Sequence, residues 1–61
     1  MTNFIKLESL NGEVIIDTYG ITYIATHPNR ENVIVVYHRE INLVLSKEKY
    51  SFDSLLKIIQ K

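Results

Sequence analysis

The sequence predicts a small α+β protein in which an antiparallel sheet of about five strands carries one C-terminal helix packed on one face. Three observations lead to this fold class. The pair Asn11-Gly12 lies between two apolar-alternating runs and is a strong signal for a β-hairpin. The segment Val33–Tyr37 is an unbroken apolar, mostly β-branched run, typical of a buried strand. From Phe52 the apolar spacing changes from the period of a strand to that of a helix.

The first hairpin joins Phe4–Leu10 to Glu13–Asp17. With Asn11 and Gly12 as a two-residue type I′ loop, Lys6 is expected opposite Asp17, as an exposed ion pair worth about 0–1 kcal/mol. Directly opposed residues share a face of the sheet, so one face should be apolar. That face carries Ile5, Leu7, Val14 and Ile16. A shift of the strand register by one residue would expose these apolar side chains to water.

Two further strands are predicted in the middle of the chain. Residues Ile21–His27 alternate weakly and form the third strand, which a turn at Gly20 opens. Residues 27–32 read as a loop, because Pro28 lacks a backbone donor and asparagine favours turns. The fourth strand, Asn32–Tyr37, is expected to be central and buried on both faces.

A fifth strand, Ile41–Leu45, follows a tight turn near residues 38–40. The C-terminal helix is then predicted from four apolar residues at helical spacing. They are Phe52, Leu55, Leu56 and Ile59. Ser51 is a suitable N-cap, Asp53 suits the positive end of the helix dipole, and Tyr50 is expected to pack on Leu55.

Length and composition bound the classes of protein. The chain has 61 residues and no cysteine, which predicts one domain, residues 1–61, without disulfides. Seven basic and seven acidic residues give a formal net charge of zero, which argues against nonspecific binding to a nucleic-acid polymer. No long apolar run is present, so no membrane partner is expected, and we expect a cytoplasmic protein.

A domain of about 60 residues buries little surface, so it commonly needs disulfides, a metal or association with other copies. One amphipathic helix cannot cover both faces of the central strand. We therefore expect a homo-oligomer, in which another copy covers the remaining apolar face or a strand edge. The alternative is that the chain folds alone, as many domains of this size do.

The residues give little indication of catalysis. His27 and His38 fall at opposite ends of the predicted third and fourth strands, on the order of 20 Å apart, and should not share a metal. Both are expected to be solvent-facing loop histidines. No nucleophile signature or glycine-rich phosphate loop occurs in the sequence. We expect a protein that is not an enzyme and uses no cofactor.

Two polar clusters could bind a ligand. They lie at residues 37–39 and 27–30, and Tyr23 adds aromatic surface nearby in the sequence. Arginine offers a planar fork for an anion, and tyrosine or histidine can stack on a base. The candidate ligand-binding residues are Tyr37, His38, Arg39, Arg30, His27 and Tyr23. The alternative is that they are turn residues kept soluble by charge. Residues 47–49 read as a solvated loop.

The order of these features resembles the small flagellar and swarming motility family (FlbD/SwrD-like). Residues 5–12 match the hairpin with which that family opens, and residues 21–24 match its middle strand, with Pro28 following at a similar distance. Residues 53–59 are similar to its closing acidic-serine segment, which leads into a short helix. The resemblance implies a β-plus-helix layout, a role as a protein-interaction accessory, and no catalytic residues.

The chain is also similar in size and composition to small phage accessory proteins, some of which sequester nucleotide immune signals as oligomers. Two hypotheses follow. In the first, a non-catalytic homo-oligomer acts as an anti-defence sponge that holds an anionic nucleotide at the subunit interface. In the second, the protein is an interaction accessory whose exposed sheet edge or apolar patch captures a partner segment.

Overall fold

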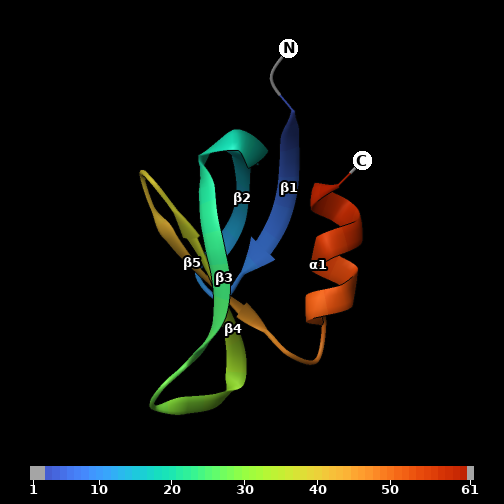
Figure 1. Cartoon of the computed structure of the whole chain (residues 1–61). Coiled ribbons are helices and arrows are strands. Elements are labelled where there is room, and N and C mark those ends of the chain that lie inside the picture. Colours follow the sequence, from blue (N-terminus) through green and yellow to red (C-terminus); the bar gives the residue numbers. More distant parts are fainter. Residues whose placement is uncertain (1–2, 61) are drawn as a thin grey trace.

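The computed structural model describes residues 3–60 and has the predicted α+β class, with antiparallel strands and a C-terminal helix (Figure 1). The elements in chain order are β1 (Phe4–Ser9), β2 (Gly12–Asp17), η1, a 3-10 turn (Thr18–Gly20), β3 (Ile21–His27), β4 (Arg30–His38), β5 (Asn42–Ser46) and α1 (Phe52–Ile59). Within this part of the chain, the strands form a β1-β2 hairpin and a sheet of order β3-β4-β5. The fourth strand is therefore central, as predicted.

The five strands belong to two sheets, where the sequence predicted one. The turn η1 ends the hairpin, and the Asp17 carboxylate caps it by accepting from the backbone N–H of Tyr19 at 2.9 Å. This turn redirects the chain, so that β3 leads into the second sheet instead of pairing with β2. The hairpin still meets the edge of β5, where the Leu10 N–H donates to the Val44 carbonyl at 2.9 Å.

The predicted register of the hairpin is wrong by two residues. Ser9 lies opposite Gly12, so Leu10 and Asn11 form the loop. Only Gly12 has a positive φ there, 127°, and a type I′ loop at Asn11-Gly12 is therefore excluded. The Ser9 hydroxyl stabilises the observed turn, because it donates to the Gly12 carbonyl at 2.7 Å and accepts from the Asn11 N–H at 3.2 Å.

The two faces of the hairpin are nevertheless as predicted, because an even shift in register keeps every side chain on its side. The predicted Lys6–Asp17 pair is wrong. Lys6 lies opposite Ile15, and its amino group is 3.7 Å from the Glu13 carboxylate. The Asp17 carboxylate instead faces Arg39, at 3.8 Å.

The strands of the second sheet lie close to their predicted positions. The fourth strand begins at Arg30, two residues early, since the loop after β3 is only Pro28-Asn29. The fifth strand begins at Asn42, because Ile41 stays in the preceding turn, where its carbonyl accepts from the His38 N–H at 3.0 Å. Both differences are local.

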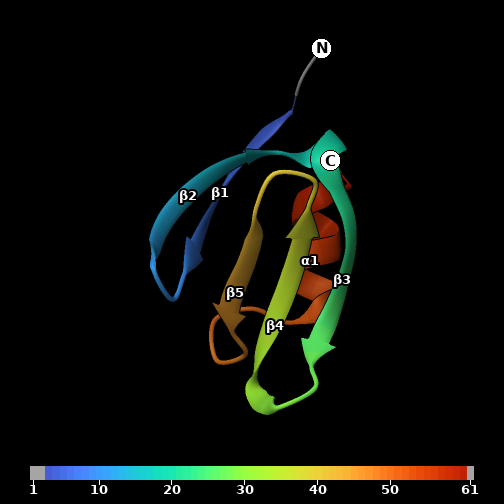
Figure 2. The same cartoon turned by 90° about the vertical axis from the view of Figure 1, so that its left-hand side faces the viewer.

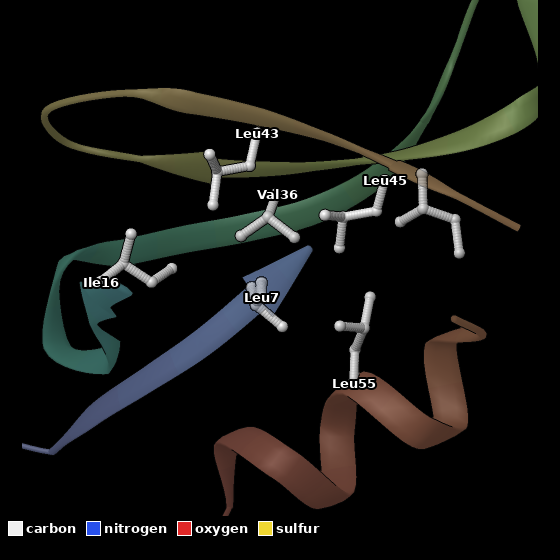
Figure 3. Packing of buried hydrophobic residues seen from close by; sticks show 7 residues of the cluster. Leu7, Ile16, Val36, Leu43, Leu45 and Leu55 are labelled. Atoms are coloured by element: carbon white, nitrogen blue, oxygen red, sulfur yellow. The ribbon is translucent and has the colours of Figure 1, made fainter. Parts of the chain in front are cut away.

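The core lies between the three-stranded sheet on one side and the hairpin and helix on the other (Figure 3). Alternate residues of β4 and β5 face it, because Ile34 is paired with Leu45 and Val36 with Leu43. The buried cluster consists of Leu7, Ile16, Ile34, Val36, Leu43, Leu45 and Leu55. A single helix residue, Leu55, is fully buried in this cluster.

The helix begins as predicted. The Ser51 hydroxyl accepts from the Ser54 N–H at 3.1 Å, and the Ser54 hydroxyl accepts from the Ser51 N–H at 2.9 Å, which forms a capping box. The predicted apolar face is only partly buried, because Phe52 and Leu56 remain 44% and 50% exposed. The buried side is rotated away from these two residues and is centred on Leu55.

The segment before the helix ties it to the hairpin. Tyr50 packs against the cluster that contains Leu55, in agreement with the predicted staple. Its hydroxyl also accepts from the Glu8 N–H at 3.0 Å. The Lys49 amino group donates to the Glu8 carboxylate, although residues 47–49 are exposed as predicted. This hydrogen bond lowers the pKa of Glu8 and raises the pKa of Lys49.

The Glu8–Lys49 pair predicts a pH-dependent contribution to stability. A lowered carboxyl pKa stabilises the fold above the ordinary value of 4.5 and is lost as the pH falls through the folded pKa of Glu8. A raised amine pKa stabilises below 10.5 and is lost as the pH rises through the folded pKa of Lys49. We expect Lys49→Met to lower the melting temperature slightly at pH 7 and to have no effect in strong acid.

Thermal unfolding of both proteins between pH 2 and pH 8 measures this difference. Lys47→Met, in the same exposed turn, is the matched control for loss of a positive charge. A pH-independent difference between Lys49→Met and the wild type would contradict the assignment.

Candidate functional site

The face of the β3-β4-β5 sheet that points away from the helix carries the candidate site. In Figure 2 this face is toward the viewer, α1 lies behind it, and none of the drawn helices or strands crosses it. Its side chains alternate with the core-facing Ile34 and Val36. We define the open face as Tyr23, Ala25, Val33, Val35, Tyr37 and Val44, which the strand register places on one side.

The open face is apolar at its centre. Val35 is flanked by Ala25 on β3 and by Val44 on β5, and no charged side chain lies among these three. Val33 and Val35 are each 3% exposed, although they lie outside the core cluster. Both side chains are therefore almost completely shielded from water on a face that no drawn helix or strand crosses. The prediction of a fourth strand buried on both faces is confirmed.

An aromatic pair occupies one end of the open face. The rings of Tyr23 and Tyr37 are stacked, with centroids 4.3 Å apart and an interplanar angle of 21°. Tyr23 is 57% exposed and lies on the edge strand, whereas Tyr37 is half-buried on the central strand. The Thr22 hydroxyl donates to the Tyr37 carbonyl at 3.1 Å. Two of the candidate binding residues, Tyr23 and Tyr37, thus lie together and present an aromatic surface.

His38 does not lie in a solvent-facing loop as predicted, because it is buried, with 7% of its surface exposed. Its Nδ1 accepts from the Glu40 N–H at 3.1 Å, so the proton of the neutral ring is on Nε2. That Nε2–H donates to the Asp17 carbonyl at 3.0 Å. Both ring nitrogens are therefore used by the backbone, and His38 holds the end of the hairpin against β4.

Gly20 makes this arrangement possible. A Cβ atom at Gly20 would lie 2.2 Å from Nε2 of His38, well inside contact distance. The Gly20 carbonyl also accepts from the Arg39 N–H at 2.9 Å. We call the contact of η1 with residues 38 and 39 the joint, because it fixes the hairpin on the three-stranded sheet.

Arg39 also belongs to the joint. Its guanidinium group is 3.8 Å from the Asp17 carboxylate, although the side chain is 62% exposed. A carboxylate at this position opposes the binding of a second anion by Arg39. The predicted cluster at residues 37–39 is therefore divided, with Tyr37 on the open face and His38 and Arg39 in the joint.

The second predicted cluster lies at the far end of β3 and β4. Arg30 is exposed and lies opposite His27, whose Nδ1 accepts from the Asn29 N–H at 3.0 Å. His27 and His38 are thus at opposite ends of the sheet, as predicted. Among residues 3–60 no group of three metal-binding side chains is found. Ligand binding by His27 and Arg30 stays a prediction.

A shallow surface pocket of about 320 Å³ lies at the end of β4 and β5, and the sequence did not indicate it. Its lining residues are Asn32, Ser46, Lys47 and Glu48. They meet because Val33 is paired with Ser46 and the Lys47 N–H donates to the Asn32 carbonyl at 2.9 Å. A pocket created by strand register leaves no local sequence signal.

Comparisons of the chain with known proteins identified no relative. No family profile, no curated protein and no solved structure matches the chain. Both resemblances, to motility proteins and to phage accessory proteins, therefore stay predictions. In the part of the chain that the structure describes, no helix is long and apolar enough to cross a membrane.

The close packing in the joint predicts that a single methyl group added at Gly20 destabilises the protein. We expect Gly20→Ala to lower the free energy of unfolding by about 1–3 kcal/mol, because the new Cβ overlaps the buried His38 ring. The loss should be smaller in a His38→Ala background, where the ring is absent. Urea denaturation of the wild type, both single variants and the double variant measures this coupling. Additive losses would show that the two residues do not interact.

Proposed function

We propose that the protein is a non-catalytic binding protein that associates with copies of itself and uses the open face as its interaction surface. The observation that carries this proposal is the Tyr23–Tyr37 stack on the face of β3-β4-β5 that no drawn helix or strand crosses, since Val33 and Val35 at the centre of that face are each only 3% exposed. Apolar surface removed from water stabilises a complex by about 25 cal/mol per Å² before the costs of association. Tyrosine is enriched among residues that dominate interface energies, and Tyr23 is well exposed.

The charged and titratable groups support a binding role over catalysis. Both nitrogens of the His38 ring are engaged by backbone groups, so this histidine has no free lone pair for a general base. Arg39 is held beside Asp17. The two side chains most suited to acid–base or anion chemistry near the open face thus serve the joint.

Self-association should depend on the aromatic end of the open face. We expect the wild type to form dimers or larger assemblies at micromolar to millimolar concentration. Tyr23→Ser should raise the dissociation constant about tenfold, since truncating an interface tyrosine commonly costs more than about 1 kcal/mol. Sedimentation equilibrium measures both values.

The matched control is Ile15→Ser on the hairpin. Ile15 is 66% exposed, more than Tyr23, but lies on the outer side of β2. It should leave the dissociation constant unchanged. A wild type that stays monomeric throughout the concentration range contradicts self-association, and an equal effect of the two variants contradicts the role of the open face.

An interaction accessory of the motility type would use the same face for a segment of another protein.

A second candidate function is binding of an anionic nucleotide, which the stacked tyrosine pair favours, because the exposed ring of Tyr23 can stack on a base. Arg39 faces a carboxylate, and Arg30 lies at the far end of β3 and β4 from the tyrosine pair. The charge balance of the chain makes this the less supported candidate.

Calorimetry with a panel of cyclic and linear nucleotides tests the second candidate. If it is correct, at least one nucleotide binds and Tyr23→Ser weakens binding about tenfold, as expected for about 1–3 kcal/mol per stacked base. Arg30→Ala, at the far end of β3 and β4, should leave the binding of a single nucleotide unchanged. Arg39→Ala serves as the comparison for a paired arginine. Absence of heat with every nucleotide would rule out this candidate.

A further inference from the structure

The outer edge of β3 is the feature of the molecule that most needs a partner. In the order β3-β4-β5, β3 is an edge strand, and in Figure 1 it lies in front with no other element over it. Half of the backbone N–H and C=O groups of an edge strand point outward and can pair with another strand. The seven residues of β3, Ile21–His27, include no lysine, arginine, aspartate or glutamate.

The edge of β3 is interrupted by register irregularities between Ile21 and Tyr23 and between Thr26 and His27, which leave a regular stretch at residues 23–26. The other strand edges have further protection. The hairpin strands carry charged side chains, including Lys6 and Glu8 on β1 and Glu13 on β2, and charges on an edge discourage pairing. The strand β5 is also uncharged, but its outer edge meets the hairpin, where Leu10 donates to Val44. An uncharged, uncovered edge is therefore found only on β3 within residues 3–60.

We propose that β3 of one copy pairs antiparallel with β3 of a second copy, about a two-fold axis at Ile24. This inference rests on the proposed self-association and deepens it, because it names the strand edge beside the open face along which two copies would pair. A second copy is favoured over an unrelated strand because of charge. When a strand pairs with its own copy, like charges from the two copies lie close together and repel each other. The β3 strand carries no such charges, so this repulsion does not arise.

The register about Ile24 follows from the regular stretch and the side-chain sizes of the strand. It centres the pairing on the regular stretch of β3, residues 23–26, and places Tyr23 opposite Ala25 of the partner subunit. The exposed tyrosine ring can then cover the small alanine side chain on both sides of the axis. Thr22 lies opposite Thr26 of the partner subunit, and both threonines are exposed in the single chain.

This pairing joins the two open faces. Directly opposed residues share a face, and the register is even, so both open faces lie on the same side of a six-stranded sheet. The two Tyr23–Tyr37 stacks then flank the axis and form one aromatic surface. A seven-residue edge buries less than the roughly 800 Å² per partner of a standard interface, so the dimer should be weak and concentration-dependent.

Charge substitutions at the two threonines test the register. Thr26→Lys should weaken the dimer, because a lysine on an edge strand discourages pairing. Thr22→Glu with Thr26→Lys should restore it, since each new carboxylate lies opposite a new amine across the axis. Thr22→Lys with Thr26→Lys should abolish it. Ile15→Lys, on β2, is the control for an added charge at an exposed strand position.

Sedimentation velocity gives the dissociation constants, and thermal unfolding confirms that every variant folds. We expect about a tenfold increase for Thr26→Lys and recovery to within threefold of the wild type for the charge-swapped double variant. Amide hydrogen exchange of β3 in the wild type should slow as the concentration rises. Self-association that Thr26→Lys leaves unchanged overturns the β3 pairing but leaves the proposed function standing. A wild type that never associates overturns both.

Discussion

The contact between the His38 ring and the backbone of Gly20 sets the arrangement of the whole molecule. Here the hairpin is fixed on the three-stranded sheet, which it also meets at the edge of β5 through the Leu10–Val44 hydrogen bond. The ring is held at both nitrogens, and the Asp17–Arg39 pair and the Arg39 N–H reinforce the same contact. With the hairpin held at this angle, its apolar face and the helix cover one side of the sheet and leave the other side open.

Element positions were largely predictable from the sequence, because hydrophobic periodicity is local. The strand Ile21–His27 and the helical segment from Phe52 to Ile59 agree with the structure. The double-sided burial of the fourth strand also follows directly from its β-branched run. The hairpin register was not predictable from Asn11-Gly12 alone. This pair fits a type I′ loop, but it also fits the observed turn, in which only the glycine has a positive φ.

The candidate site was harder to predict, since it depends on contacts between distant segments. In the sequence, His38 and Arg39 belong to a polar tripeptide after a strand. A ligand-binding loop has the same local pattern. Their role becomes clear only when Asp17 and Gly20 are brought beside them. Tyr23 and Tyr37 were predicted as binding residues, but their stacking follows from a bulge near Thr22 that places them directly opposite each other.

The hydrogen bond from Glu8 to the Tyr50 hydroxyl joins residues 42 positions apart, near the two ends of the chain. Contacts of such wide sequence separation form late and slow the folding of small domains. The apolar side of the hairpin is therefore fully sheltered only after the helix segment, about 40 residues later in the chain, has packed against it. Until that helix segment has been synthesised and packs, the nascent polypeptide leaves the apolar side of the hairpin exposed, and this partly folded state is the one most prone to aggregation.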